Sequence, residues 1–552
     1  MNFVSANNIE ASPLEADVII VGTGAAGLPL ACELIGSSLK VVVLESGDFE
    51  MDGETQALAE GEVAKGSQHG SLSSFRKRVF GGTTSVWGGR CAPFDDLDFQ
   101  KRDYVPFSGW PISRADLDPY YERAHHYLDL GVYSYRNEEG LDEGEREVIP
   151  GLPGEIWKQD THWKFSLPTH LGKSCRSRVS DSPNIQVVFQ ANATQLLTND
   201  DGSQITGVEV ATLEGCKFEV MAPRVVVAAG GLESTRLLLA SNRVNSAGLG
   251  NTFDQLGRYY SSHVSGDLGE VSFKNDAQDV HWIYEKTSGG IYAKRNLRLS
   301  EEVQKKHGLL NARFILTHPS FADASHGNSV LSAAYLAKRF FKGQIPPEYS
   351  KELSAPGFHS VPQHFRNVVF GIPSLIKFSL HWFFKRIIAK RKYPSISLKS
   401  KANCYTIHFD SEQTPNPESR VMLSEQKDRF GMPLVKVAWQ YVPSDLDSVM
   451  TSYKLLRDEL TKGDLGIFTQ TEEESETLVK NGFGVGSHHI GTTRMSDDPH
   501  FGVVDANCQV HGVKGLFVSS PSTFPTGSFA NPVLTTVALA IRLADFIKTE
   551  SA

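Results

Sequence analysis

The segment Asp17-Val-Ile-Ile-Val-Gly-Thr-Gly-Ala-Ala-Gly27 decides the fold of this chain. Val18 to Val21 form an apolar, mostly β-branched run, which is typical of a parallel strand that is buried on both faces. Gly22, Gly24 and Gly27 follow with the spacing G-x-G-x-x-G. The first glycine permits a tight turn, the second lets a pyrophosphate approach the backbone, and the third lets the next helix pack closely on the strand. The segment therefore predicts a strand, a phosphate-binding turn and a helix.

The residues that follow complete a dinucleotide-binding unit. A helix is expected from about Ala25 to Ile35, with its N–H groups and positive dipole end directed at the phosphate. A second strand, Lys40 to Leu44, ends in Glu45. A carboxylate at that point can accept hydrogen bonds from both ribose hydroxyls and would repel a 2′-phosphate. The alternative, an ordinary βαβ unit whose glycines only serve packing, does not explain the acid.

Composition limits the remaining possibilities. The chain has 552 residues, of which 40% are hydrophobic and 22% charged, so a globular protein of two or more domains is expected. The net charge of −9 argues against nucleic acid as the main partner. The six cysteines are scattered without a C-x-x-C pair, so we predict neither a metal site nor a disulfide scaffold. No signal peptide and no apolar run of about 18 to 20 residues is found, which favours a cytoplasmic location.

A second glycine-rich stretch follows a polar segment, 48 to 78, that we expect to be a loop. Between Val79 and Arg90 the chain carries the candidate cofactor contacts Gly81, Gly82, Thr83, Ser85, Val86, Trp87, Gly88 and Gly89. Glycines and small hydroxyl residues favour a loop whose backbone lies against a flat ring or a phosphate. Val86 and Trp87 indicate that this loop is buried, whereas a mobile surface loop is the alternative.

These two motifs together resemble the glucose–methanol–choline (GMC) flavoprotein oxidoreductases. Further segments agree in order along the chain. They are Val225 to Gly231 with the following Glu-Ser-Thr-Arg, the segment Gly484 to Met495, and Asn531-Pro-Val-Leu-Thr535. The resemblance implies FAD as the cofactor, with further contacts from Ala25, Ala26, Ser46, Ala229, Gly230 and Pro532. Some sugar oxidases of the family attach their flavin through a histidine, and Val86 occupies that position here, so we expect non-covalent binding.

The resemblance also implies an α/β fold with a discontinuous, doubly wound FAD domain. Residues 1–108, 180–265 and 475–552 are expected to form this Rossmann-like domain. Residues 109–179 and 266–474 are expected to form a substrate-binding domain over an antiparallel sheet. The alternating pattern of residues 184 to 220, interrupted by Asn-Asp-Asp-Gly at 199–202, independently predicts antiparallel strands.

The resemblance assigns catalysis to His488 and Asn531. Oxidation of an alcohol removes the hydroxyl proton and sends a hydride from carbon to flavin N5. A neutral imidazole is suited to take that proton near neutral pH, and an amide can hold the same oxygen without titrating. Asn531-Pro532 could alternatively serve only to cap the last helix, which is expected to run to about residue 547.

Four other histidines need a separate interpretation. His489 could replace His488 if the register slipped, but we expect it to face away and form a packing hydrogen bond. We expect His263, His500 and His511 to be structural, because the sequence indicates no partner for them.

The pairing of histidine with Asn-Pro is most similar to pyranose oxidases, glycoside 3-oxidases and several sugar dehydrogenases. It therefore implies oxidation of a ring hydroxyl of a sugar or glycoside to a keto-sugar. Sterols and other apolar alcohols are the alternative substrates. Dioxygen, a quinone or dye, and a redox protein all remain open as electron acceptor. A GMC-fold lyase, or a flavin subunit that depends on a partner, would not require His488 and Asn531.

The region 325–400 is the least similar to the family. Residues 368–388 are apolar, with basic residues among them and up to residue 392. Such a segment can lie on a membrane surface or a partner. We favour the alternative, an insertion that packs over the substrate entrance or in a homo-oligomer contact.

Overall fold

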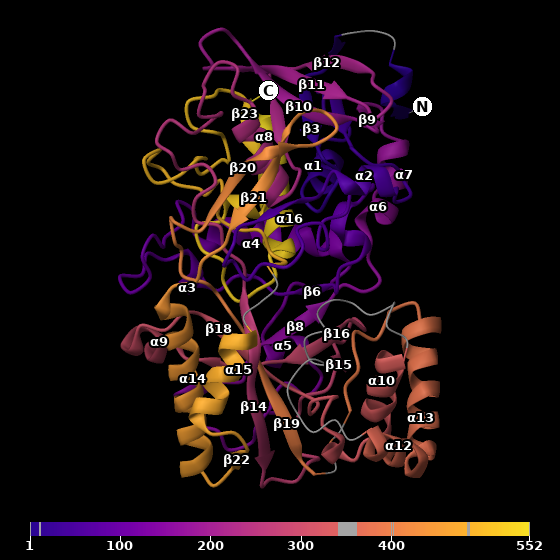
Figure 1. Cartoon of the computed structure of the whole chain (residues 1–552), viewed down its shortest axis with the longest axis vertical. Helices are drawn as coiled ribbons and strands as arrows, with labels where there is room; N and C mark the ends of the chain where they lie inside the picture. Colours follow the sequence, from indigo (N-terminus) through magenta and orange to yellow (C-terminus); the bar gives the residue numbers. More distant parts are fainter. Residues whose placement is uncertain are drawn as a thin grey trace.

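The computed structural model describes residues 2–9, 13–340, 361–398, 400, 402–482 and 486–550. Part of the predicted insertion, 341–360, and Gly484 and Val485 of the C-terminal motif lie outside these residues. Two lobes stack along the long axis of the molecule, and both chain termini lie in the upper lobe (Figure 1). This arrangement places a parallel sheet in one lobe and an antiparallel sheet in the other.

A six-stranded parallel sheet forms the centre of the upper lobe. Its strands, in order across the sheet, are β1 (Phe3–Ser5), β9 (Ile185–Phe189), β4 (Val41–Leu44), β3 (Val18–Val21), β13 (Val225–Val227) and β23 (Leu516–Val518). The sheet thus unites segments from the beginning, the middle and the end of the chain. The strands predicted at Val18–Val21 and Lys40–Leu44 are both present, the second one residue shorter.

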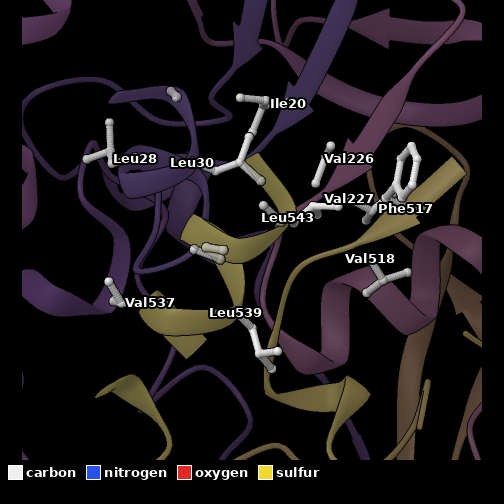
Figure 2. Packing of buried hydrophobic residues seen from close by; sticks show 14 of the residues in the cluster. Ile20, Leu28, Leu30, Val226, Val227, Phe517, Val518, Val537, Leu539 and Leu543 are labelled. Atoms are coloured by element: carbon white, nitrogen blue, oxygen red, sulfur yellow. The ribbon is translucent and has the colours of Figure 1, made fainter. Parts of the chain in front are cut away.

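Helix α1 (Gly27–Glu33) packs on this sheet, whose strands are mostly apolar, at β3 and β4. Helices α8 (Gly231–Ala240) and α16 (Val533–Glu550) lie in the same lobe, and α1 and α4 (Arg114–Leu128) pack on α16. Figure 2 shows Ile20 and Val226 of the sheet close to Leu543 of α16, within the main hydrophobic core. Helix α4 falls in the range that we expected for the substrate domain, and the domain boundaries remain predictions.

The lower lobe is built on a four-stranded antiparallel sheet. Its order is β18 (Ala312–Thr317), β19 (Cys404–Ser411), β14 (Val264–Phe273) and β22 (Gly466–Phe468). The helices α9 (Glu301–His307), α14 (Pro443–Lys462) and α15 (Glu472–Gly482) belong to the same lobe, and α15 packs against β14 (Figure 1). Because β14 begins directly after the upper lobe, its first residues lie between the two sheets.

Four smaller sheets complete the fold. The first has the order β10 (Asn192–Thr198), β11 (Ile205–Ala211), β12 (Lys217–Met221), β2 (Leu14–Glu15). The second has the order β15 (Glu285–Lys286), β16 (Tyr292–Arg295), β8 (His162–Phe165), β6 (Arg90–Cys91). The third has the order β20 (Arg420–Lys427), β21 (Pro433–Ala438), β5 (Gly61–Val63), and the fourth pairs β17 (Arg298–Leu299) with β7 (Trp157–Lys158).

The loop expected at 48–78 is only partly irregular. It contains helix α2 (Gly53–Ala57), which Asp52 caps, and strand β5, which pairs in parallel with β21. The prediction of a loop was wrong at β5, because its partner strand lies far away along the chain and leaves no local pattern.

Among the described residues, no helix combines the length and the apolarity that a membrane crossing requires.

Candidate active site

A cavity of about 1550 Å³ lies at the carboxyl ends of the parallel strands and extends between the two lobes. Most of the predicted site residues line it: Gly22, Gly24, Ala25, Ala26, Glu45, Ser46, Gly82, Thr83, Val86, Trp87, Gly88, Gly89, Ala229, Gly230, His488, Asn531 and Pro532. Gly27, Gly81 and Ser85 do not line it. The structure therefore brings both glycine-rich loops and both candidate catalytic residues to one space.

The three predicted residues outside the lining lie just behind it. A Cβ on Gly27 would lie 1.9 Å from the carbonyl oxygen of Gly22, so this glycine allows the helix to start against the turn. Gly81 has a φ of +97°, which only glycine adopts readily, and opens the 3-10 turn Gly82–Ser85. The two glycines therefore shape the loops that face the cavity.

The end of strand β4 provides a buried carboxylate at the cavity wall. Oε2 of Glu45 accepts hydrogen bonds from the backbone N–H, at 3.0 Å, and the hydroxyl of Thr23, and Oε1 accepts one from the N–H of Gly47 at 2.8 Å. Burial raises the pKa of Glu45, whereas these donors and the nearby Arg78 act in the opposite direction. The carboxylate is thus held rigidly at the position that the sequence predicted.

The cavity fits a dinucleotide in three respects. A Cβ on Gly24, Gly88 or Gly230 would meet no atom within 4 Å, so these loops present bare backbone to the open space. Helices α8 and α16 begin at the cavity, where their N–H groups favour an anion. The volume also exceeds the roughly 300–1000 Å³ of ordinary ligand pockets, which leaves room for a cofactor and a substrate together.

The loop at Val86 differs from its prediction. The side chain of Val86 is 58% exposed and lines the cavity, so the expectation that it is buried within the protein was wrong. Trp87 is half-buried, and its indole N–H donates to the carbonyl oxygen of Thr169 at 2.9 Å. The indole anchors the loop, while the smaller valine points into the space beside it.

His488 and Asn531 lie together where the two lobes meet. Nδ2 of Asn531 is 3.2 Å from Nε2 of His488. Oδ1 of Asn531 accepts a hydrogen bond from Nε of Arg90 at 2.7 Å, which fixes the amide with its NH₂ group toward the imidazole. The side chain of Asn531 therefore does more than cap α16, which begins at Val533.

A second histidine determines the tautomer of His488. Nδ1 of His263 lies 2.7 Å from Nδ1 of His488, and Nε2 of His263 lies 3.2 Å from the carbonyl oxygen of Gly527. Because a carbonyl oxygen only accepts, Nε2 of His263 carries the proton and Nδ1 accepts one from His488. Nε2 of His488 is then unprotonated, and its lone pair accepts the hydrogen bond from Nδ2 of Asn531. The expectation that His263 has no relevant partner was wrong.

Electrostatics keep both imidazoles neutral. Burial lowers the pKa of His488 well below its ordinary value, and His263 and Arg90 lower it further, whereas Asp410 acts in the opposite direction. Burial also lowers the pKa of His263. A neutral His488 with an unprotonated Nε2 has the protonation state that a general base requires.

The other three histidines lie outside this pair. His489 packs beside Tyr260 and His69, with ring centroids 6.3 and 6.2 Å away. As expected, its ring forms a hydrogen bond, with the backbone of Gly486, whereas its Nε2 has no partner among the described residues. His500 contacts Asp498, and His511 contacts the carbonyl oxygen of Ser496.

The sequence indicated no role for a charged wall of the cavity beside Asn531. Arg90 forms an ion pair with Asp410 at 2.8 Å, and Nδ1 of His408 lies 2.8 Å from Asp267. Although burial opposes it, the pKa of Asp410 is held well below its usual range by Arg90 and His408. Burial lowers the pKa of His408. The hydrogen bond to Asp267 and the charges of Asp267 and Asp410 outweigh burial, so the pKa of His408 is raised above its ordinary value. The period-two spacing of His408 and Asp410 on one strand face was the available signal.

Comparisons with known proteins agree with this site. Residues 17–269 match the model described as FAD dependent oxidoreductase, and residues 415–540 match GMC oxidoreductase. The 6′′′-hydroxyparomomycin C oxidase of Streptomyces lividus is 36% identical over 97% of this chain and 92% of its own length. The fructose dehydrogenase large subunit of Gluconobacter japonicus is 23% identical over 97% and 98%. A solved fungal aryl-alcohol oxidase shares the fold, with a TM-score of 0.55, 15% identity, and coverage of 97% of this chain and 99% of that one.

The chain belongs to the GMC oxidoreductase family. It is an FAD-dependent oxidoreductase of the kind that acts on alcohol groups, and the fold class, the family and the cofactor predicted from the sequence are confirmed.

Proposed function

We propose that this protein oxidises a secondary alcohol of a sugar or glycoside to the corresponding keto-sugar. One observation carries the proposal: Nε2 of His488 and Nδ2 of Asn531 lie 3.2 Å apart at a cavity whose adjoining wall, reached through Arg90, is polar and charged. The pair can engage one hydroxyl group, and the wall can bind the others.

His488 acts as the general base. Its Nε2 takes the hydroxyl proton, because the bond between the two Nδ1 atoms leaves this nitrogen unprotonated. Nδ2 of Asn531 donates a hydrogen bond to the same oxygen, and Arg90 keeps the amide in that orientation. FAD, when bound, supplies the acceptor for the hydride that leaves the carbinol carbon. General-base help of this kind contributes about 10² to 10⁴ in rate.

The substrate class follows from the wall of the cavity. Asp267, His408, Asp410 and Arg90 present carboxylates, an imidazole and a guanidinium, which suit a molecule with several hydroxyl groups. These groups already pair with one another, but a sterol would remove water from them without replacing its hydrogen bonds, at a cost of about 1–3 kcal/mol for each polar atom left unsatisfied. The name of one relative, fructose dehydrogenase, also indicates a sugar.

Apolar alcohols remain the second candidate, on one observation. Pro394 and Ser395 line the cavity and follow closely after a helical segment with a largely apolar exposed face. An apolar substrate could approach along that face.

The cofactor contacts are proposed from the cavity lining. Glu45 accepts hydrogen bonds from the ribose hydroxyls, and the turn at Gly22 and Gly24 binds the pyrophosphate. The loop Gly82–Gly89 lies against the flavin ring system. Binding is non-covalent, because Val86 offers no nucleophile for attachment. The electron acceptor is dioxygen, a quinone or dye, or a redox protein.

The test is anaerobic bleaching of the flavin by a panel of sugars, glycosides, polyols, sterols and aliphatic alcohols. This measurement needs no electron acceptor. Bleaching by a sugar or glycoside, with a keto-sugar as product, is the expected result. Bleaching by sterols or aliphatic alcohols alone would replace the proposal with the second candidate, and no bleaching by any alcohol would contradict both.

A further inference from the structure

The helices of the least family-like region carry an exposed apolar face. They are α12 (Val361–Phe370), α13 (Ile372–Trp382) and the π-helical turn η4 (Phe383–Ile388), which continues α13. Figure 1 shows α12 and α13 beside α10 (Ser329–Phe340) at the outer edge of the lower lobe. Of the nineteen large apolar side chains that are exposed among the described residues, ten lie between 365 and 388. We name these ten the apolar face: Phe365, Val369, Phe370, Ile372, Ile376, Leu380, Phe383, Phe384, Ile387 and Ile388.

The apolar face follows helical periodicity. Within α13 and η4, its residues 372, 376, 380, 383 and 387 are spaced by three or four positions and are 47% to 55% exposed. This spacing places them along one side of a helix. Phe370, at the turn between the two helices, is 80% exposed. Exposed apolar stripes of this size mark a surface that another body covers.

Polar contacts and a small core hold the opposite side against the lobe. The ring of His364 is buried, with its nitrogens 3.0 Å from the hydroxyl of Ser332 and 3.3 Å from the carbonyl oxygen of Ala322. Nδ2 of Asn367 donates to the carbonyl oxygen of Ala324 at 2.8 Å, and Val368 packs on a small hydrophobic cluster. These contacts fix α12 to the protein. Helix α13 packs against α10, its His381 contacts the ring of Tyr393, and Arg386 of η4 donates a hydrogen bond to the carbonyl oxygen of Tyr393 at 2.8 Å, while the apolar face stays exposed.

The charge of this segment differs from that of the rest of the chain. Between residues 361 and 398 the sequence has seven lysines and arginines and no aspartate or glutamate, although the whole chain has a net charge of −9. Lys377, Lys385 and Lys390 are exposed and form no ion pair with any described residue. An apolar stripe flanked by lysines is complementary to a lipid bilayer, whose acyl chains are apolar and whose head groups can be anionic.

We propose that α13 and η4 form an interfacial helix that docks the enzyme on a bilayer containing anionic lipids. The seventeen residues would lie in the plane of the head groups over about 25 Å, with the apolar face inserted and the lysines at the phosphates. A second copy of the chain fits less well, because a two-fold contact through this face would oppose its positive charges.

Docking would place the entrance of the active site at the lipid surface. The ring of Tyr393 lies 5.3 Å from that of His381 on α13 and 5.2 Å from that of Tyr284, which lines the cavity. The next two residues, Pro394 and Ser395, line the cavity as well. An acceptor or substrate dissolved in the bilayer would then reach the cavity without crossing bulk water. This inference does not depend on the identity of the alcohol.

The test is co-sedimentation of the holoenzyme with vesicles of phosphatidylcholine alone or mixed equally with phosphatidylglycerol. We expect at least about tenfold tighter binding to the anionic vesicles, and weaker binding at high salt. The triple variants I376S/L380S/I387S and K377E/K385E/K390E should each reduce binding at least about tenfold. Both should keep the activity measured with a soluble dye, because their side chains are exposed and outside the cavity.

Matched controls use exposed residues elsewhere. V132S/I467S/F501S and K217E/K306E/K514E remove the same kinds of side chain from other surfaces and should bind vesicles as the wild type does. Failure of the wild type to bind anionic vesicles would overturn the proposal, as would equal losses in the controls. If the wild type binds no vesicles but forms a dimer, and I376S/L380S/I387S is a monomer, the apolar face would instead be assigned to contact with a second copy of the chain.

Discussion

Nδ1 of His263 and Nδ1 of His488 lie 2.7 Å apart, although 225 positions separate the two residues in the sequence. When both rings are neutral, only one of these two nitrogens carries a proton. Nε2 of His263 donates to the carbonyl oxygen of Gly527, so Nδ1 of His263 is unprotonated and the proton lies on Nδ1 of His488. The protonation of His488, the base in the proposed reaction, therefore depends on a backbone carbonyl group that His488 does not touch.

His263 should accordingly behave as a positioning residue. In His263→Leu the proton of His488 can move to Nε2, so kcat should fall about ten- to hundredfold with little change in KM. His263→Asn keeps an acceptor near the same place and should retain most of the activity. Steady-state kinetics of both variants provide the measurement. Equal losses in the two, or a change confined to KM, would argue against tautomer control.

The ion pair of Arg90 and Asp410 should stabilise the folded protein. The carboxylate of Asp410 is 5% exposed, so Arg90→Met leaves a buried charge without its partner. Such a loss costs about 3 kcal/mol. The double variant R90M/D410N removes the charge and should recover much of that loss. Thermal unfolding compares the three proteins, and a double variant no more stable than R90M would show that the charge is not the cause.

Glu45 should affect retention of FAD. In Glu45→Gln the side chain keeps its size but loses its charge, so we expect FAD to bind about tenfold more weakly through the loss of a charge-assisted hydrogen bond. The FAD that remains after repeated dilution and filtration gives the measurement. Full occupancy in the variant would remove Glu45 from the ribose contact.

The flavin should be released by acid. Val86 faces the cavity and has no nucleophilic atom, so precipitation with trichloroacetic acid should leave the yellow colour in the supernatant. A yellow pellet after washing would reveal a covalent attachment elsewhere on the chain.

The sequence predicted the parts of the site that local pattern defines. The strand Val18–Val21, the glycines after it and Glu45 all lie within thirty residues, so strand period, turn chemistry and the terminal acid could be interpreted together. His488 and Asn531 came from resemblance, because forty-three positions separate them and no periodicity links them.

Other relationships depend on tertiary structure. Arg90 reaches Asn531 across 441 positions, and His263, directly before β14, reaches His488 across 225 positions, so neither partner could be derived from spacing. The apolar pattern of residues 368–388 was visible, but not the direction it faces. That direction depends on tertiary contacts: His364 and Asn367 hold α12, and α10 and Tyr393 hold α13.

The role of His488 can be measured most directly as the rate of anaerobic flavin reduction by the best sugar substrate, in the wild type and in His488→Ala. Because burial lowers the pKa of His488 below 6.5, its neutral form should persist at neutral pH. The wild-type rate should therefore fall only as the pH drops below that value. We predict that His488→Ala binds FAD normally and reduces it at least about 10²-fold more slowly at neutral pH. A variant that reduces its flavin at the wild-type rate would contradict the assignment of His488 as the base.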